Sequence, residues 1–147
     1  PLLLAKNPAH LENALAFARE HLTDGGPVLV YASADAGRVK AAQAELGVEQ
    51  AGELVEKALG VLARALVSEG VGQLVVAGGE TSGAVVSALC IRQLRIGDQI
   101  DPGVPWTQTP LEGMDAPLTL ALKSGNFGSE DFFSRAFEVL ETRTKGK

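Results

Sequence analysis

The sequence is poor in several residue types, and each scarcity excludes a class of protein. One cysteine and two histidines among 147 residues allow no internal disulfide and form no cluster at zinc-ligand spacing. No apolar run approaches the roughly 20 residues of a membrane span, and no basic segment followed by an apolar core marks a signal peptide. We therefore expect a cytoplasmic protein without a membrane partner, since a single cysteine fits a reducing compartment.

Positive charge is scarce as well. Lys and Arg number 13 against 18 Asp and Glu, which gives a formal net charge of −5. Because nucleic-acid surfaces need clustered Lys and Arg to neutralise phosphates, we expect no nucleic-acid partner. A mononucleotide is a different case, since backbone N–H groups at a helix N-terminus and one or two cations can bind its phosphates.

Glycine, in contrast, is abundant, with 17 residues, whereas aromatic residues make up 5%. The length fits one domain, and 46% hydrophobic with 21% charged residues is typical of a globular protein. The chain begins at Pro1 without an initiator Met, so we expect it to be part of a longer protein.

The spacing of apolar residues predicts alternating helices and strands. Amphipathic or apolar helical patterns cover residues 8–22, 50–69, 80–89 and 129–140. Short apolar runs predict strands at residues 28–31, 73–77 and 118–122, the first of them buried, and residues 92–96 are expected to form a further strand. Residues 97–116 are proline-containing and are expected to form an ordered loop, Cys90 is expected to be buried on a helix, and the polar tail 141–147 is expected to fray.

The order strand, glycine turn, helix, strand over residues 73–96 is that of a βαβ unit, which usually joins parallel strands. We therefore predict an α/β fold with a mostly parallel sheet flanked by helices, a Rossmann-like three-layer domain.

The first candidate for ligand chemistry follows the strand at 73–77 and reads Ala77-Gly78-Gly79-Glu80-Thr81-Ser82-Gly83. Glycines let phosphate oxygens approach the backbone, the helix that starts here offers unpaired N–H groups, and the two hydroxyls add donors. A helix cap with a tight turn is the alternative. The segment is not a Walker A loop, because Ala84-Val85 stand where Lys and Ser or Thr are required.

The second candidate is Lys123-Ser124-Gly125-Asn126-Phe127-Gly128, which follows the strand at 118–122. Lys123 lies where ligands collect in open α/β sheets and could neutralise a phosphate, or it could be an ordinary exposed strand-end lysine. Gly125 could pass beneath a nucleotide. For Phe127 we favour covering the core over stacking on a base, and for Trp106 anchoring a loop over lining an adenine pocket.

Three motifs in this order resemble the C-terminal domain of the four-carbon acid sugar kinases. They are Val75 to Ala84, Asp101-Pro102-Gly103-Val104-Pro105-Trp106, and Leu122 to Gly128. The resemblance covers nearly the whole chain, and the Gly-Val-Pro-Trp part is most similar to the 3-oxo-tetronate 4-kinase branch. It implies ATP-dependent phosphorylation of a hydroxyl on a four-carbon sugar acid.

The resemblance also assigns residues. Gly78, Gly79, Glu80 and Thr81 match the phosphate-side ATP loop and Gly125 the second nucleotide contact, with Ser82, Lys123 and Asn126 grouped beside them. Mg²⁺ would bridge the phosphates, with Glu80 orienting one of its waters and Lys123 offsetting developing negative charge.

The family also has a Gly-Ser-Cys-Ser segment and an N-terminal domain that binds the sugar acid, and neither is present in residues 1–147. We therefore expect these residues to form the nucleotide-binding C-terminal domain of a two-domain kinase. The catalytic base is expected in the other domain, and this chain is expected to be inactive alone.

Several alternatives stay open at the level of sequence. Threonate and erythronate kinases share most of the motifs. A nucleotide-binding regulatory module would bind ATP or ADP without transfer. A hydrolase using Ser82 or Thr81 as nucleophile lacks both a His partner and a G-x-S-x-G elbow. Homo-oligomerisation is also left open.

Overall fold

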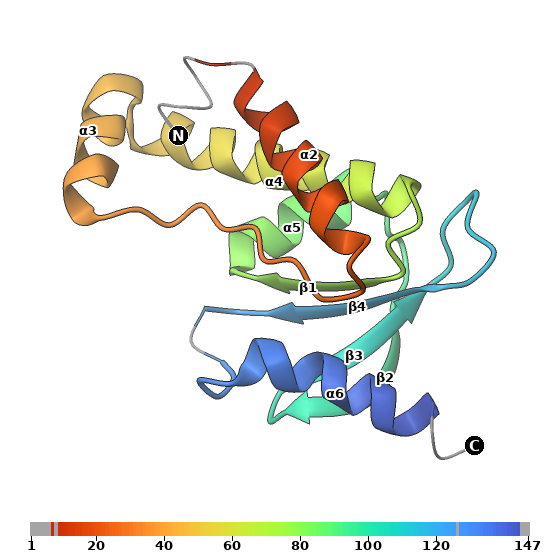
Figure 1. The fold of residues 1–147 in the computed structure, drawn as a ribbon. Coiled ribbons are helices and arrows are strands. Elements are labelled where there is room, and N and C mark those ends of the chain that lie inside the picture. The colour runs from red at the N-terminus through yellow and green to blue at the C-terminus, as the bar shows by residue number, and fades with distance from the viewer. Residues whose placement is uncertain (1–6, 8, 126, 145–147) are drawn as a thin grey trace.

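The protein is built around a four-stranded sheet in the order β1-β4-β3-β2 (Figure 1). The structure, a computed structural model, describes residues 7, 9–125 and 127–144. The strands are β1 (Gln73–Ala77), β2 (Arg95–Asp101), β3 (Val104–Thr109) and β4 (Leu118–Lys123). β1 pairs with β4 in parallel, whereas β4 with β3 and β3 with β2 are antiparallel. The predicted α/β class is confirmed, but the sheet is mixed rather than mostly parallel.

Helices cover both faces of this sheet, as the three-layer prediction requires (Figure 1). The helices are α2 (Ala9–Leu22), α3 (Ala36–Leu46), α4 (Val48–Ser68), α5 (Gly79–Ala88) and α6 (Phe132–Thr144). α4 and α5 form one core with β1 and β4, centred on buried Leu118 and Leu120. α6 forms the second core on the other face, where Trp106 and Phe132 are buried. None of the described helices combines the length and apolar character that crossing a membrane requires.

α4 and α5 approach each other closely at a glycine. A Cβ on Gly60 would lie 3.2 Å from the carbonyl oxygen of Ala84 and 3.2 Å from the Cβ of Ala88. Because Gly60 has no side chain, α5 packs directly on the backbone of α4. This contact fixes α5, and with it the glycine segment at its start.

The predicted loop at 97–116 is wrong, because most of it forms the β2–β3 hairpin. Pro102 and Gly103 occupy the turn between Asp101 and Val104, and Gly103 has a φ of +80°. Proline followed by a glycine with positive φ is the signature of a type II turn. These residues therefore connect two strands instead of preventing them.

The predicted strand at 28–31 is also wrong. The segment is not in a strand, and its Leu29 and Tyr31 are 62% and 71% exposed. Apolar and β-branched residues favour a strand only where a neighbouring strand completes the ladder, and β1 pairs only with β4 among the described residues. The apolar pattern also does not predict α3, which begins at Ala36, where the N-cap residue Asp35 accepts from the N–H of Arg38.

Three smaller predictions need correction. The strand expected at 92–96 begins at Arg95 and pairs with β3, not with β1. Cys90 is exposed rather than buried, with a φ of +55° directly after α5. The last helix begins at Phe132 and continues to Thr144, so residues 141–144 are helical rather than frayed.

Candidate functional site

The two glycine segments singled out in the sequence lie side by side, because each follows the carboxyl end of one of two paired strands, β1 and β4. Parallel pairing of β1 with β4 places Ala77 opposite Lys123, and the N–H of Gly78 donates to the carbonyl oxygen of Lys123 at 2.9 Å. The carboxyl ends of both strands therefore meet, which is where ligands bind in open α/β sheets. Sequence spacing alone does not predict this contact, because it depends on the order of strands.

The first segment starts α5 without a side-chain cap. Gly78 is the N-cap residue, with φ 116° and ψ 130°, and has no side chain to accept from the first-turn N–H groups. A Cβ at Gly78 would lie 3.2 Å from Oγ1 of Thr81, whereas one at Gly79 would meet nothing within 4 Å. The N-terminus of α5 thus presents uncapped N–H groups behind an open glycine surface, which suits an anion.

The expected set of backbone donors is narrower than the sequence suggested. The N–H of Gly78 is bonded to Lys123, and the N–H of Ser82 donates to the carbonyl oxygen of Gly78 at 2.8 Å. The hydroxyl oxygen of Ser82 is buried and has no hydrogen-bond partner among the described residues. A buried hydroxyl cannot act as a surface nucleophile, so the geometry disfavours the hydrolase alternative at Ser82. The N–H groups of Gly79, Glu80 and Thr81 are the remaining donors of the segment.

Lys123 is not an ordinary exposed strand-end lysine, since the residue is only 9% exposed. Its Nζ donates to the carbonyl oxygens of Ser124 at 3.1 Å and Gly125 at 3.4 Å, and lies 5.6 Å from the ring centroid of Phe132. The ammonium group is therefore held inside the second segment. Gly125 beside it is exposed, and a Cβ there would meet nothing within 4 Å.

The aromatic residues near the site have distinct roles. Trp106 is 2% exposed and its Nε1 donates to the carbonyl oxygen of Ala136 at 2.9 Å. The indole anchors β3 to α6 rather than a loop, so that part of the prediction is wrong; because the indole is buried, it also cannot line an adenine pocket. Phe127 is 51% exposed, and its ring lies over Gly103, whose Cβ would meet it at 3.3 Å. The expectation that Phe127 covers the core is wrong. Asn126 lies outside the described residues.

A family model described as a nucleotide-binding C-terminal domain matches residues 2–133. The chain belongs to this family. It is 59% identical over 140 residues to a 3-oxo-tetronate kinase of Pseudomonas fluorescens. The aligned residues cover 95% of this chain and 31% of the relative. A 3-oxo-tetronate kinase of Burkholderia multivorans is 56% identical over 142 residues, covering 96% of this chain and 32% of the relative.

A solved structure supports the same family. The crystal structure of a Haemophilus influenzae protein matches with a TM-score of 0.79 and 39% identity, over 90% of this chain and 31% of the other. The family resemblance drawn from the three motifs is confirmed. This nucleotide-binding domain spans about a third of the length of the relatives it matches.

Glu80, in the nucleotide-binding domain's first segment, faces a second carboxyl group that the sequence did not point to. Loss of solvent raises the pKa of Glu56 on α4, and Glu80 raises it further through its negative charge and a hydrogen bond between the two side chains. The carboxyl group of Glu56 therefore favours its protonated form more than an isolated glutamic acid does. Within the described ranges no three or more His, Cys, Asp or Glu side chains form a metal-binding group.

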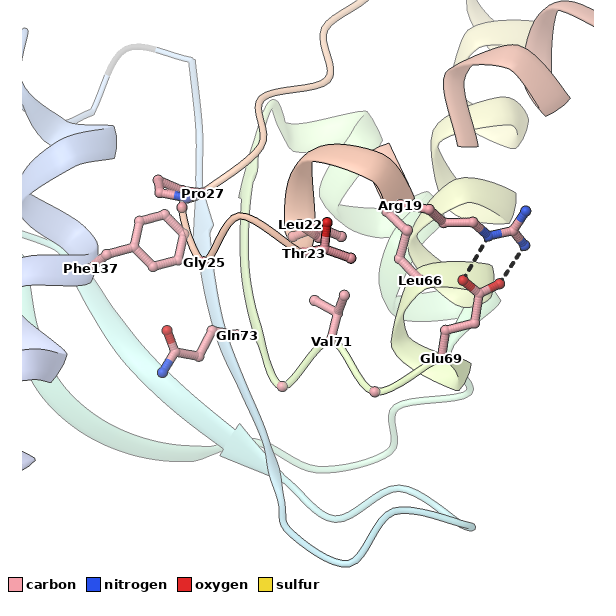
Figure 2. A pocket seen from close by; sticks show the side chains of 13 residues that line it. Arg19, Leu22, Thr23, Gly25, Pro27, Leu66, Glu69, Val71, Gln73 and Phe137 are labelled. Carbon is pink, nitrogen blue, oxygen red and sulfur yellow. Dashed lines mark hydrogen bonds and ion pairs between the residues drawn. The ribbon is translucent and has the colours of Figure 1, made fainter. Parts of the chain in front are cut away.

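The candidate site includes exposed backbone at Gly79 and Gly125. A cavity of about 710 Å³ lies at the opposite, amino-terminal end of β1, beside Gln73 (Figure 2). One wall carries the ion pair in which Arg19 donates to both carboxylate oxygens of Glu69, at 2.8 and 2.5 Å. None of the glycine-segment residues lines this cavity.

Proposed function

We propose that this domain binds ATP at the carboxyl edge of β1 and β4, within a kinase that phosphorylates a hydroxyl of a four-carbon sugar acid. The observation that carries the proposal is the hydrogen bond between Gly78 and Lys123. It brings the uncapped N-terminus of α5 beside the start of the segment that holds the Lys123 ammonium group, and helix N-termini and lysine ammonium groups both bind phosphate.

The phosphate groups would lie against the N-terminus of α5. The N–H groups of Gly79, Glu80 and Thr81 supply donors, and the bare surface of Gly79 allows the close approach that a Cβ would prevent. The positive end of the helix dipole adds about 0.3–1 kcal/mol per negative charge. The N–H groups of Gly78 and Ser82 already donate to carbonyl oxygens. The phosphate would therefore be bound only by the three N–H groups between them, in the first turn of α5.

Lys123 would supply the positive charge for the terminal phosphates. Its ammonium group donates to neutral carbonyl oxygens, at 3.1 and 3.4 Å, and an anionic oxygen is a stronger acceptor. Mg²⁺, when bound, would neutralise the phosphate oxygens, and Glu80 would hold one of its waters. Gly125 forms the second, open surface against the nucleotide.

The sugar acid and the base that accepts its proton would belong to an N-terminal domain, with residues 1–147 forming the C-terminal one. The relatives named 3-oxo-tetronate kinase support 3-oxo-tetronate as the substrate and ATP and ADP as the nucleotides. A threonate or erythronate kinase, or a regulatory module that only binds nucleotide, is the second candidate. The first two remain candidates because threonate and erythronate kinases share most of the motifs. The regulatory module remains a candidate because nucleotide binding does not require a sugar acid. With one cysteine, the kinase is proposed to act in the cytoplasm.

The test is calorimetric titration of the chain with ATP and a nonhydrolysable analogue, with and without Mg²⁺. Gly79→Ala and Gly125→Ala introduce a methyl group into the proposed nucleotide surface, yet neither Cβ meets an atom within 4 Å. Both variants should fold normally and bind at least about tenfold more weakly, a loss of about 1.4 kcal/mol. Gly83→Ala is the matched control, since it lies later on α5 and its Cβ also meets nothing within 4 Å.

The outcomes separate the candidates. If Gly79→Ala and Gly83→Ala bind nucleotide equally well, the α5 N-terminus is not the phosphate site. Turnover of 3-oxo-tetronate, threonate or erythronate by the full-length protein identifies the branch. Nucleotide binding without turnover of any of the three favours the regulatory module.

A further inference from the structure

The second glycine segment is held at both ends by different parts of the fold. At its start, the carbonyl oxygen of Lys123 accepts from Gly78 at 2.9 Å. Directly after its last residue, Gly128, the backbone N–H and the hydroxyl of Ser129 both donate to Oδ2 of Asp101, at 2.8 and 3.0 Å. Asp101 is the last residue of β2, on the far side of the sheet from β1.

Asp101 is itself fixed by a second interaction. Its other oxygen, Oδ1, forms an ion pair with Arg135 of α6, which also donates to the carbonyl oxygen of Ile100 at 3.1 Å. The Asp101 side chain is only 9% exposed, and a buried carboxylate is costly unless both oxygens are paired. The carboxylate therefore links β2, α6 and the end of the glycine segment.

A third contact supports the middle of the segment. The ring of Phe127 lies over the turn glycine that follows Asp101, with 3.3 Å between the ring and a Cβ built on Gly103. The β2–β3 turn thus touches the segment at Phe127 and at Ser129. Gly125 lies between these contacts and the fixed start at Lys123.

We propose that Asp101 is a positioning residue for the nucleotide: it sets the place of Gly125 relative to the N-terminus of α5 without touching the ligand. This role rests on the proposed function, because it assumes that Gly125 contacts the nucleotide. Positioning matters for such sites, since small displacements of a binding surface reduce affinity strongly.

The test compares three substitutions in the purified chain. Asp101→Ala removes the acceptor for Ser129 and the partner of Arg135. Asp101→Asn keeps an oxygen for Ser129 but loses the ion pair. Thr107→Val is the matched control, because it removes one buried hydrogen bond on the neighbouring strand, from Thr107 Oγ1 to the carbonyl oxygen of Leu120 at 2.6 Å, away from the segment.

Two readouts are needed: the dissociation constant of the nonhydrolysable ATP analogue, and amide hydrogen exchange at residues 127–129 without ligand. All three variants should lower the unfolding midpoint. Only Asp101→Ala should weaken nucleotide binding, by about tenfold, and accelerate exchange in the segment. Asp101→Asn should keep affinity within about threefold of the unsubstituted chain, because its oxygen preserves the contact to Ser129.

The proposal is overturned if folded Asp101→Ala binds the analogue normally, or if Thr107→Val weakens binding as much. If Asp101→Ala does not fold, Ser129→Ala removes one of the two donors, and unchanged affinity with unchanged exchange refutes the role. If the unsubstituted chain binds no nucleotide, the proposed function fails and the positioning role fails with it. If the unsubstituted chain binds but Asp101→Ala neither weakens binding nor accelerates exchange, only the positioning role is overturned.

Discussion

Replacing Gly128 by alanine tests the packing beneath the second glycine segment. Gly128 has a φ of +91°, which L-residues rarely adopt. A Cβ at this position would lie 2.8 Å from Cδ2 and 3.0 Å from Cγ of Phe132, and 3.3 Å from Cε of Lys123. The substitution therefore combines backbone strain with a steric clash.

The two costs can be estimated separately. Left-handed backbone costs a non-glycine residue about 1–2 kcal/mol. Overpacking a well-packed core costs about 1–3 kcal/mol, and Phe132 cannot move away easily because it is 1% exposed within the second core. We expect Gly128→Ala to lower the free energy of unfolding by about 2–5 kcal/mol.

The assay is urea unfolding followed by circular dichroism, with Gly113→Ala as the matched control. Gly113 has a similar φ of +84°, but a Cβ there meets nothing within 4 Å. This control carries the strain alone, so it should lose only about 1–2 kcal/mol. Equal losses in the two variants would refute the reasoning, because the contact with Phe132 would then contribute nothing.

Three further predictions concern other parts of the fold. Cys90→Gly should raise the free energy of unfolding by about 0.5–1 kcal/mol, because Cys90 has a φ of +55° at the end of α5; an unchanged urea midpoint would contradict this. Trp106→Phe loses the hydrogen bond to Ala136 and leaves a cavity, so it should cost about 2–4 kcal/mol, and a loss below about 1 kcal/mol would contradict the anchoring role. The raised pKa of Glu56 favours its protonated form in the folded state, so stability should fall as pH rises above the ordinary value of 4.5. Glu56→Gln should abolish that fall, and stability profiles between pH 4 and 7 that run parallel to the unsubstituted chain would refute the carboxyl pair with Glu80.

Local sequence signals predicted the parts of the site but not their arrangement. The strand at Gln73–Ala77 was predicted at its observed bounds, and α5 begins within one residue of the expected position. Both are set by neighbouring residues: an apolar run for the strand, and Gly78 followed by Glu80 for the helix start. The meeting of Gly78 with Lys123 depends on β4 pairing with β1, which no local pattern encodes.

The errors share one physical cause, since a strand exists only where a partner completes its hydrogen bonds. Residues 28–31 have the composition of a strand but lie outside the sheet, with Tyr31 71% exposed. Residues 95–101 have mostly exposed side chains, yet they form β2 because the turn at Pro102 and Gly103 brings β3 beside them. For β2, the turn residues Pro102 and Gly103 are therefore a better predictor of the strand than the hydrophobicity of its own residues.

The phosphate site proposed above is compatible with a net charge of −5. Beyond about 10 Å, charges are largely screened at moderate ionic strength, so the local groups decide whether a polyanion binds. At the carboxyl ends of β1 and β4 the N-terminus of α5 and the ammonium group of Lys123 are positive. The net negative charge of the sequence therefore does not oppose the proposed phosphate site. It does oppose the broad backbone contacts that nucleic acids require, which is consistent with a site built for one small anion.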